Sequence, residues 1–459
     1  MKQSIAILGA GESGIGAAIL GLKYGYDVFL SDAGRISDDR KAALDSHGID
    51  YEEGGHSVAR IKSANEVIKS PGIPDTAPLI IELLAQGTPV ISEIEFAYRH
   101  LSEHARVIAI TGTNGKTTTT LLTHHLLKSA GLKVALGGNI GISFAKLVAD
   151  GGYDYYVVEV SSFQLDGIVK FKPNVAVLLN ITPDHLDRYD NDFQKYVASK
   201  FKITQNLSSD EAFVYCADSQ PITQEIAKRK IEACLFAIST TNNPKWNAYL
   251  RDEHLIFDYS FKSQGKKHKV PVSEISLIGK HNMTNSMAAV MSVLNLELPI
   301  EIVLNGLKTF VNAPHRLEPC GEHKGVKFIN DSKATNVDSV FYALDGINAN
   351  IIWIAGGVDK GNDYSQLDEL VRNKVKHLIC LGVDNTKLHD HFAEMVSLIS
   401  ETTDILQAVE IAMSQAVRGD VVLLSPACAS FDLFKNYEDR GDQFKAAVKE
   451  LKSVKKIKV

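Results

Sequence analysis

The sequence of 459 residues has few cysteines, no long apolar run and no excess of basic charge. Its five cysteines are scattered and lack C-x-x-C spacing, which argues against a disulfide framework or a zinc site and favours reduced thiols. No uninterrupted apolar run reaches about 18 residues, so we expect no transmembrane helix and no membrane partner. The net charge of −6 gives no reason to expect a nucleic-acid surface. We therefore expect a cytoplasmic protein. A monomer is a separate expectation, which the composition does not determine.

Strand-like and helix-like stretches alternate along the chain in three blocks, which is typical of an α/β fold with parallel sheets. The length also favours three domains, at about 150 residues per domain. We predict a Rossmann-like domain over 1–95, a central P-loop ATPase-type domain with a parallel sheet over 96–312, and a Rossmann-like domain over 313–459. Pro314, in "NAPHR", marks the last boundary because proline breaks any helix there.

The first block contains "ILGAGESGIGAAI", in which Gly9, Gly11 and Gly14 form a G-x-G-x-x-G pattern after an apolar run. Such glycines let the backbone approach a diphosphate at the N-terminus of a helix. One interpretation is a nicotinamide oxidoreductase with Asp32 on the ribose hydroxyls. That interpretation leaves the other two blocks unexplained, and a titration with NADH would test it.

The second block contains "TGTNGKTT" between a strand at Val107–Ile110 and a helix that begins near Lys116. Small residues let backbone N–H groups reach phosphate oxygens, Lys116 supplies a positive charge, and the Thr117 hydroxyl can reach Mg²⁺. The full P-loop pattern has glycine where this chain has Ile110, so the loop is a shorter variant. We predict that nucleotide phosphates bind Gly112, Thr113, Asn114, Gly115, Lys116, Thr117 and Thr118. A transporter or motor ATPase is an alternative for this block.

Further polar residues follow the neighbouring strands of the second block. Glu159 ends the strand "YYVVE", and His185 lies in "NITPDHLDRYD" just after the next strand. Because ligands bind beyond the carboxyl ends of parallel strands, we expect both on the rim that carries the phosphate loop. A carboxylate there suits Mg²⁺. Lys200, in "YVASKFK", is interpreted from its pattern alone as a solvated helix lysine.

The third block repeats this placement in "FINDSKATN", "IAGGVDKG" and "LLSPACASFD". Each stretch follows a strand and carries lysine, threonine, serine or aspartate. Loops of this kind offer positive charge and hydroxyl donors to a small anionic ligand.

Seven stretches together resemble motifs of the Mur ligase family of peptidoglycan synthesis, in the family's order and across all three blocks. They are "TGTNGKTTTT", "EVSSFQLD", "NITPDHLDRY", "GKHNMTNSMAA", "NAPHRLE", "NDSKATN" and "LSPACASFDLFKNYEDRG". The last stretch, the compact length and the absence of a D-N-P motif favour the members that add D-glutamate. The resemblance implies an ATP-dependent amide ligase that joins D-glutamate to UDP-N-acetylmuramoyl-L-alanine through an acyl phosphate. Another Mur ligase or a folylpolyglutamate synthetase-like ligase is the alternative.

The resemblance also implies a role for individual residues. Lys116, Glu159, His185 and Lys200 would be catalytic, with two Mg²⁺ ions held by Thr117, Glu159, His185 and a carbamylated Lys200. ATP would further contact Asn282, Asn285, Arg316 and Asp331. The UDP-sugar substrate would bind the first domain and the adjoining rim at Glu12, Ser13, Gly14, Asp32, Gly72, Asn139 and Ser161. D-Glutamate would bind the third domain at Lys333, Thr335, Lys360, Ser430 and Phe431. Tyr437 stands where such ligases often have phenylalanine.

Overall fold

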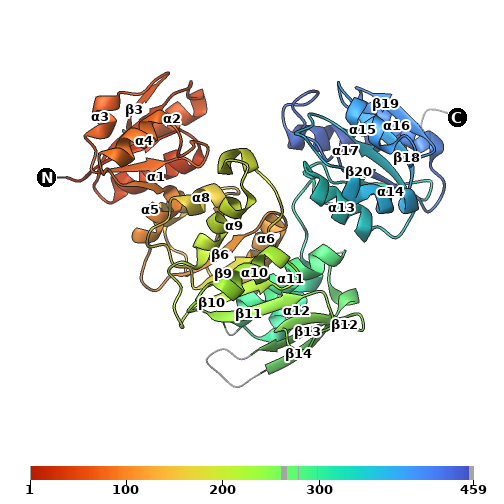
Figure 1. Ribbon diagram of the computed structural model, residues 1–459, viewed down its shortest axis with the longest axis horizontal. Helices are drawn as coiled ribbons and strands as arrows, with labels where there is room; N and C mark the ends of the chain where they lie inside the picture. Colours follow the sequence, from red (N-terminus) through yellow and green to blue (C-terminus); the bar gives the residue numbers. More distant parts are fainter. Residues whose placement is uncertain (1, 260–265, 278, 297, 454–459) are drawn as a thin grey trace. The chain divides into compact units, whose positions relative to one another are not determined.

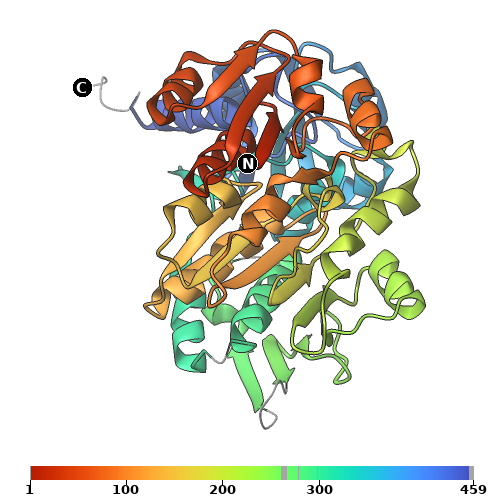
Figure 2. The ribbon, with the colours of Figure 1, turned by 90° about the vertical axis from the view of Figure 1, so that its left-hand side faces the viewer.

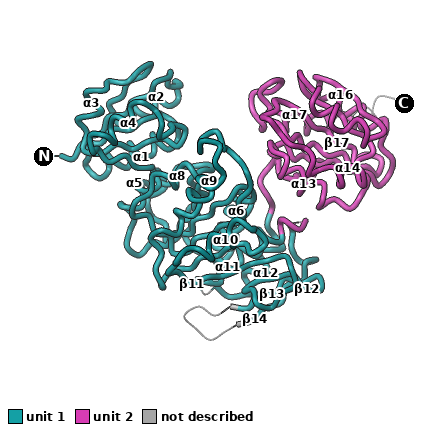
Figure 3. Tube along the Cα trace, viewed as in Figure 1, with its two compact units in different colours: residues 1–276, 283–310 teal, residues 277–282, 311–459 magenta. Residues whose placement is uncertain are grey.

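The computed structural model describes residues 2–259, 266–277, 279–296 and 298–453. The chain divides into two compact units, Met1–Ser276 with Met283–Phe310 and Leu277–Asn282 with Val311–Val459 (Figure 3). The first unit holds two sheets and the second holds one. The predicted α/β class is confirmed. No helix in these described ranges is long and apolar enough to cross a bilayer.

The first sheet has the order β3-β2-β1-β4-β5, with every pair parallel. This is the order expected of a Rossmann-like half. Figure 2 shows the strands, in red, side by side with helices around them. The strands are β1 (Ser4–Leu8), β2 (Asp27–Asp32), β3 (Asp50–Glu53), β4 (Glu66–Lys69) and β5 (Val90–Ser92). The helices are α1 (Glu12–Lys23), α2 (Asp38–His47), α3 (Val58–Lys62), α4 (Pro78–Ala85) and α5 (Glu93–Arg99).

The second sheet has the order β14-β13-β12-β11-β10-β9-β6-β8-β7 (Figure 1). Its strands are β6 (Arg106–Thr111), β7 (Val134–Gly138), β8 (Tyr155–Glu159), β9 (Val175–Leu178), β10 (Ala212–Cys216), β11 (Cys234–Ser239), β12 (Ala248–Arg251), β13 (His254–Tyr259) and β14 (Lys266–Pro271). The helices and 3₁₀ turns are α6 (Lys116–Ser129), α7 (Phe144–Asp150), α8 (Ser162–Asp166), η1 (Leu186–Tyr189), α9 (Phe193–Phe201), η2 (Lys202–Thr204), α10 (Gln220–Lys228), η3 (Val272–Glu274), α11 (Lys280–Leu294) and α12 (Ile300–Thr309).

The prediction of a parallel central sheet is right for β6–β12 and wrong for the edge formed by β13 and β14, which are antiparallel. Only Asp252 and Glu253 separate β12 from β13, and their φ angles are 49° and 55°. Two consecutive residues with positive φ form a tight hairpin turn, which only antiparallel neighbours can use.

The third sheet has the order β15-β16-β20-β17-β18-β19, parallel except for the β15–β16 pair. Its strands are β15 (Glu318–His323), β16 (Val326–Asn330), β17 (Ile351–Ala355), β18 (Val375–Leu381), β19 (Ile399–Thr402) and β20 (Val421–Leu424). The helices are α13 (Val337–Gly346), η4 (Ser365–Leu367), α14 (Asp368–Lys374), α15 (Thr386–Phe392), α16 (Ile405–Gln415) and α17 (Tyr437–Ser453). Strands such as "IIWIA" of β17 are buried along their whole length, as a parallel sheet covered on both faces requires.

Candidate active site

The loop between β6 and α6 depends on its glycines. Gly112 and Gly115 have φ angles of 151° and 84°, a region that residues with a side chain rarely adopt. A Cβ on Gly115 would lie 2.4 Å from Asn285 Oδ1, so this asparagine packs directly against the loop. The Asn285 amide oxygen also accepts a hydrogen bond from Thr119 Oγ1 at 3.3 Å. The predicted ATP residue Asn285 therefore belongs to the surroundings of the phosphate loop.

Asn180, just beyond the end of β9, holds the loop in shape. Its carbonyl oxygen accepts from Thr113 N at 2.9 Å, and its side-chain oxygen accepts from Asn114 N at 2.8 Å. Its amide nitrogen donates back to Asn114 O at 3.0 Å. These two backbone N–H groups already have acceptors, so donors for a phosphate would begin at Gly115. The sequence interpretation gave Asn180 no role, although it directly follows a buried strand, as a residue on this rim would.

Two lysine side chains converge on one carbonyl oxygen of the loop. Lys116 Nζ donates to Gly112 O at 2.9 Å and to Thr113 O at 2.7 Å. Lys200 Nζ, from α9, donates to the same Gly112 O at 2.8 Å. Lys200 is only 1% exposed, so the pattern-based interpretation of a solvated lysine is wrong. Burial and the neighbouring Lys116 charge hold the pKa of the Lys200 amine well below its usual range.

Glu159 lies next to the start of α6 and is buried. Its Oε2 accepts from Thr117 Oγ1 at 2.8 Å, and its Oε1 accepts from Asn139 Nδ2 at 2.9 Å. A carboxylate and a hydroxyl oxygen that meet beside a phosphate loop are the hard donors that Mg²⁺ prefers. Thr117 and Glu159 therefore fit a magnesium ion. Within the described ranges, no group of three or more histidine, cysteine, aspartate or glutamate side chains has the arrangement of a metal site.

His185 lies on the same rim, between β9 and η1, in a left-handed backbone conformation with φ 52°. Its imidazole is about half exposed, 3.6 Å from an Asp184 oxygen and packed edge-on against Phe163. Lys200 in its ammonium form does not fit a cation site, because it is positively charged and offers no acceptor to a metal. The predicted second magnesium site thus depends on a change in the chemistry of Lys200.

The first glycine loop shows which of its glycines the fold itself requires. A Cβ on Gly14 would lie 1.9 Å from Gly9 O, so Gly14 permits α1 to pack against the end of β1. A Cβ on Gly11 would meet nothing within 4 Å, so only Gly11 leaves open space at the start of α1. Asp32 Oδ2 accepts from Ala10 N at 2.6 Å, and its Oδ1 accepts from Gly34 N at 2.8 Å. Asp32 therefore fixes two loops of this sheet edge.

The other predicted UDP-sugar residues have mixed roles. Glu12 and Gly72 are exposed, and Ser13 is half-buried at the start of α1. Gly72 O accepts from Arg188 Nη1 at 3.2 Å, which ties the loop after β4 to η1. Ser161 forms a capping box with Gln164 at the start of α8. Asn139 and Ser161 follow β7 and β8, so both lie on the rim that carries Glu159.

The predicted D-glutamate residues lie on three loops of the second unit. These loops follow β16, β17 and β20, which are adjacent parallel strands and therefore end at one edge of the sheet. Lys333 and Thr335 lie on the first loop, Lys360 on the second, and Ser430 and Phe431 on the third. Ser430 is buried, whereas the Phe431 side chain is 74% exposed. The structure thus brings the loops that carry all five predicted D-glutamate residues to one edge of the third sheet.

Asn282, Arg316 and Asp331, three of the predicted ATP residues, also belong to the second unit. Asp331 is buried and accepts hydrogen bonds from Ser425 Oγ at 2.9 Å and Leu317 N at 3.1 Å. Burial raises the pKa of the Asp331 carboxyl to about 7, although both hydrogen bonds oppose the shift. Asn282 is buried at the start of α11.

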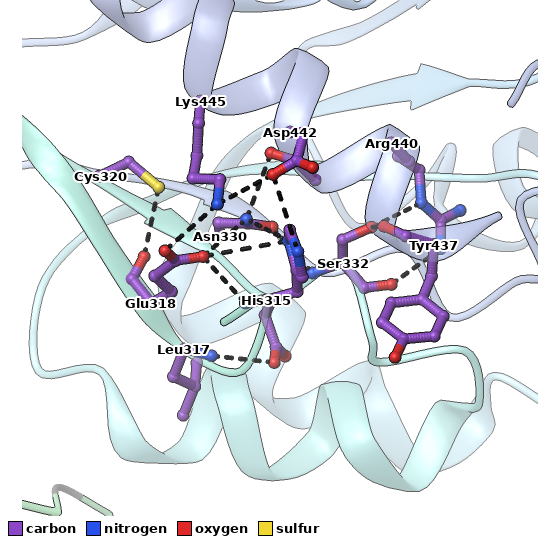
Figure 4. A network of polar contacts seen from close by, with 12 residues as sticks. His315, Leu317, Glu318, Cys320, Asn330, Ser332, Tyr437, Arg440, Asp442 and Lys445 are labelled. Atoms are coloured by element: carbon purple, nitrogen blue, oxygen red, sulfur yellow. Dashed lines mark hydrogen bonds and ion pairs between the residues drawn. The ribbon is translucent and has the colours of Figure 1, made fainter. Parts of the chain in front are cut away.

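Arg440, which the sequence interpretation missed, holds the three loops together. It is 1% exposed, and its five N–H donors all reach neutral oxygens. Nε donates to Ser332 Oγ and Nη2 to Ser332 O, both at 2.9 Å. The remaining donors reach Gly356 O at 3.4 Å and Cys428 O at 3.3 Å. Figure 4 shows Arg440 and Ser332 beside Tyr437.

Comparison with known protein families gives three matches in chain order. Residues 4–78 match the model of the MurD N-terminal domain. Residues 110–293 match the Mur ligase middle domain, and residues 315–428 match the Mur ligase glutamate ligase domain.

Two named relatives match almost the whole chain. Both are called UDP-N-acetylmuramoylalanine–D-glutamate ligase. The protein from Christiangramia forsetii is 49% identical over 451 residues, which cover 98% of this chain and 100% of the relative. The protein from Cytophaga hutchinsonii is 50% identical over 451 residues, with the same two coverages.

Solved structures of similar fold share far less sequence. MurF from Acinetobacter baumannii has a TM-score of 0.62 at 16% identity and covers 97% of this chain and 93% of its own. MurF ligase from Thermotoga maritima, solved in complex with ADP, has a TM-score of 0.58 at 16% identity, with coverages of 92% and 95%. At this identity the likeness concerns the fold alone.

Proposed function

The chain belongs to the Mur ligase family, and on that premise we propose that it joins D-glutamate to UDP-N-acetylmuramoyl-L-alanine with ATP. The convergence of Lys116 and Lys200 on Gly112 O, beside the Thr117–Glu159 pair, supports this proposal best. A phosphate loop with one additional buried amine is suited to a reaction in which a phosphoryl group moves to a second substrate. Hydride transfer by an oxidoreductase would not require the phosphate loop, the two lysines or the Thr117–Glu159 pair.

In the proposed reaction, ATP phosphorylates the carboxylate of UDP-N-acetylmuramoyl-L-alanine, and the D-glutamate amine then displaces phosphate from the acyl phosphate. Lys116 would leave the loop carbonyls and bind the β- and γ-phosphates, where negative charge moves during transfer. Backbone N–H groups from Gly115 onward would add donors at the positive end of α6. Bound Mg²⁺, held by Thr117 and Glu159, supplies further charge neutralisation.

Lys200 has the environment for carbamylation, which we propose as its state in the active enzyme. A neutral amine attacks CO₂, forms an N–C bond and loses one proton, which gives a carbamate anion. The low pKa of the Lys200 amine favours the neutral form that this step needs. The product offers two oxygens in place of an ammonium group. With His185 it could then complete the second magnesium site, which the unmodified lysine cannot do.

The substrates would meet the chain at the sheet edges already described. We propose that the UDP-sugar diphosphate lies at the start of α1, near Glu12, Ser13 and Gly11, where the backbone leaves open space. Asn139 and Ser161 would position the muramoyl-alanine end. The D-glutamate carboxylates would bind Lys333 and Lys360 as charge-assisted hydrogen bonds, with Thr335 and Ser430 as hydroxyl donors.

Phosphate release from ATP, measured with and without the two substrates, tests the proposal. We expect little release until UDP-N-acetylmuramoyl-L-alanine and D-glutamate are both present. A panel of D- and L-amino acids then establishes the acceptor. If another amino acid stimulated phosphate release and D-glutamate did not, the assignment of D-glutamate as the acceptor would be wrong. The proposed ligase reaction itself would still be supported. Release without either small substrate would instead support a transporter or motor ATPase.

A further inference from the structure

Tyr437, the first residue of α17, contacts Lys333 in the loop after β16. Lys333 Nζ donates a hydrogen bond to the Tyr437 hydroxyl at 2.9 Å and lies 4.6 Å from the centre of the tyrosine ring. Both side chains are half-buried. The contact fixes the end of a long, flexible side chain that the proposed function assigns to substrate binding.

The tyrosine is itself held by two further contacts. Its carbonyl oxygen accepts from Ser332 Oγ at 2.8 Å, and its ring meets the edge of the His315 ring at 6.1 Å between centroids (Figure 4). His315 O also accepts from Lys333 N at 3.1 Å, so the same histidine touches both partners. Arg440, one turn further along α17, binds both oxygens of Ser332. The hydroxyl of Tyr437 is therefore a fixed point for the lysine.

We propose that the Tyr437 hydroxyl is a positioning group that aims the Lys333 ammonium at a carboxylate of the incoming amino acid. This inference rests on the proposed function, which places that amino acid against Lys333. An ammonium has three donors, so a bond to the phenol does not by itself use up its capacity to bind a carboxylate. A phenol oxygen orients the amine without neutralising its charge, whereas a carboxylate partner would compete with the substrate. Holding the side chain in advance lowers the entropy that binding must remove.

Tyr437→Phe is the most direct variant, because it keeps the ring on Lys333 and His315 and removes only the hydroxyl. We expect KM for D-glutamate to rise about 3- to 10-fold, the usual net contribution of one hydrogen bond. The value of kcat and the KM for ATP should stay within about twofold. A melting temperature equal to that of the wild type shows that the variant folds normally.

A double-mutant cycle with Lys333→Met provides the control. In the Lys333→Met background, Tyr437→Phe should change KM for D-glutamate by less than about twofold, since the two groups act through one contact. Equal effects of Tyr437→Phe in both backgrounds would overturn the proposal. So would an unchanged KM in the single variant.

Amine labelling tests the contact without any substrate. The rate at which a water-soluble acylating reagent labels Lys333, followed by peptide mass spectrometry, should rise in Tyr437→Phe because the hydroxyl no longer holds the amine. An unchanged rate would contradict the proposed contact. If wild-type protein showed no D-glutamate-dependent phosphate release but the labelling rate still rose, the proposed function would be at fault and the Tyr437–Lys333 contact would stand.

Discussion

Lys200 and Arg440 are both buried basic side chains without a carboxylate among their hydrogen-bond partners in the described chain, yet their surroundings differ. Lys200 in the first unit donates one hydrogen bond, to Gly112 O, and its Nζ lies 4.7 Å from the Tyr196 ring centre. Arg440 in the second unit uses all five of its donors on Ser332, Gly356 and Cys428. Burial lowers the pKa of Arg440 only to about 10, so it stays charged at neutral pH.

The difference separates a reactive group from a supporting one. A buried amine with a strongly lowered pKa and one acceptor has a lone pair available for chemistry. A buried guanidinium whose donors are all satisfied stabilises the loops around it and has none. Substitution of Lys200 should therefore lower the activity more than the stability. Substitution of Arg440 should mainly lower the stability.

The largest expected effect is that of Lys200→Ala on activity. We expect the rate of substrate-dependent phosphate release to fall roughly a thousandfold, the scale of removing a group that stabilises charge in the transition state. Formate or acetate should restore part of the rate by occupying the space of the lost carbamate. Full activity in the unrescued variant would remove Lys200 from the site.

The effect of Arg440→Met on stability comes next. This variant leaves buried carbonyl oxygens without donors, so the free energy of unfolding should fall by about 3 kcal/mol. Chemical denaturation followed by fluorescence measures the change. Arg440→Lys is the matched control, since it keeps the charge but supplies three donors instead of five, and its loss should be intermediate. Equal free energies of unfolding for the wild type, Arg440→Met and Arg440→Lys would contradict the supporting role of Arg440. A loss of about 3 kcal/mol in Lys200→Ala would contradict the contrast between the two residues.

The smallest expected effect, taken per pH unit, extends the comparison to a buried acid. Glu93, at the start of α5, accepts from Ala145 N, and its Oε2 has no partner in the part of the chain that the structure describes. Burial raises the pKa of this carboxyl from 4.5 to about 8. The pKa of Glu93 is higher in the folded protein than in the unfolded chain, so protonated Glu93 contributes to the free energy of unfolding. This contribution is complete below about pH 4.5 and is lost as the pH rises through 8.

The measurement is the pH dependence of unfolding in wild type and Glu93→Gln. The wild type should lose roughly 1 kcal/mol per pH unit more than the variant between pH 5 and 8. Asp331, whose pKa is about 7, contributes in the same direction in both proteins and cancels in the difference. Parallel pH profiles would show that Glu93 is ionised in the folded protein.

Much of the fold and the rim could be predicted because the signals are local. The glycine pattern of "TGTNGKTT" correctly predicted a loop between β6 and a helix from Lys116, and Glu159 was correctly predicted at a strand end. Burial of the two cations could also have been found. Lys200 shares a helix face with Tyr196 and Val197, and Arg440 shares one with Phe444 and Val448, all buried.

The partners of these cations could not be predicted. Gly112 lies 88 residues before Lys200, and Ser332 lies 108 residues before Arg440, so only the folded chain brings them together. The antiparallel pairing of β12 with β13 also escaped prediction, because Asp252 and Glu253 adopt a positive-φ turn without the glycine that usually signals it.

The most direct test of this account is a ¹³C NMR spectrum of the protein equilibrated with ¹³C-bicarbonate. The account predicts one carbamate resonance in the wild type that is absent from Lys200→Ala and retained in Arg440→Lys. A fully active wild-type protein without any Lys200-dependent carbamate resonance would contradict it.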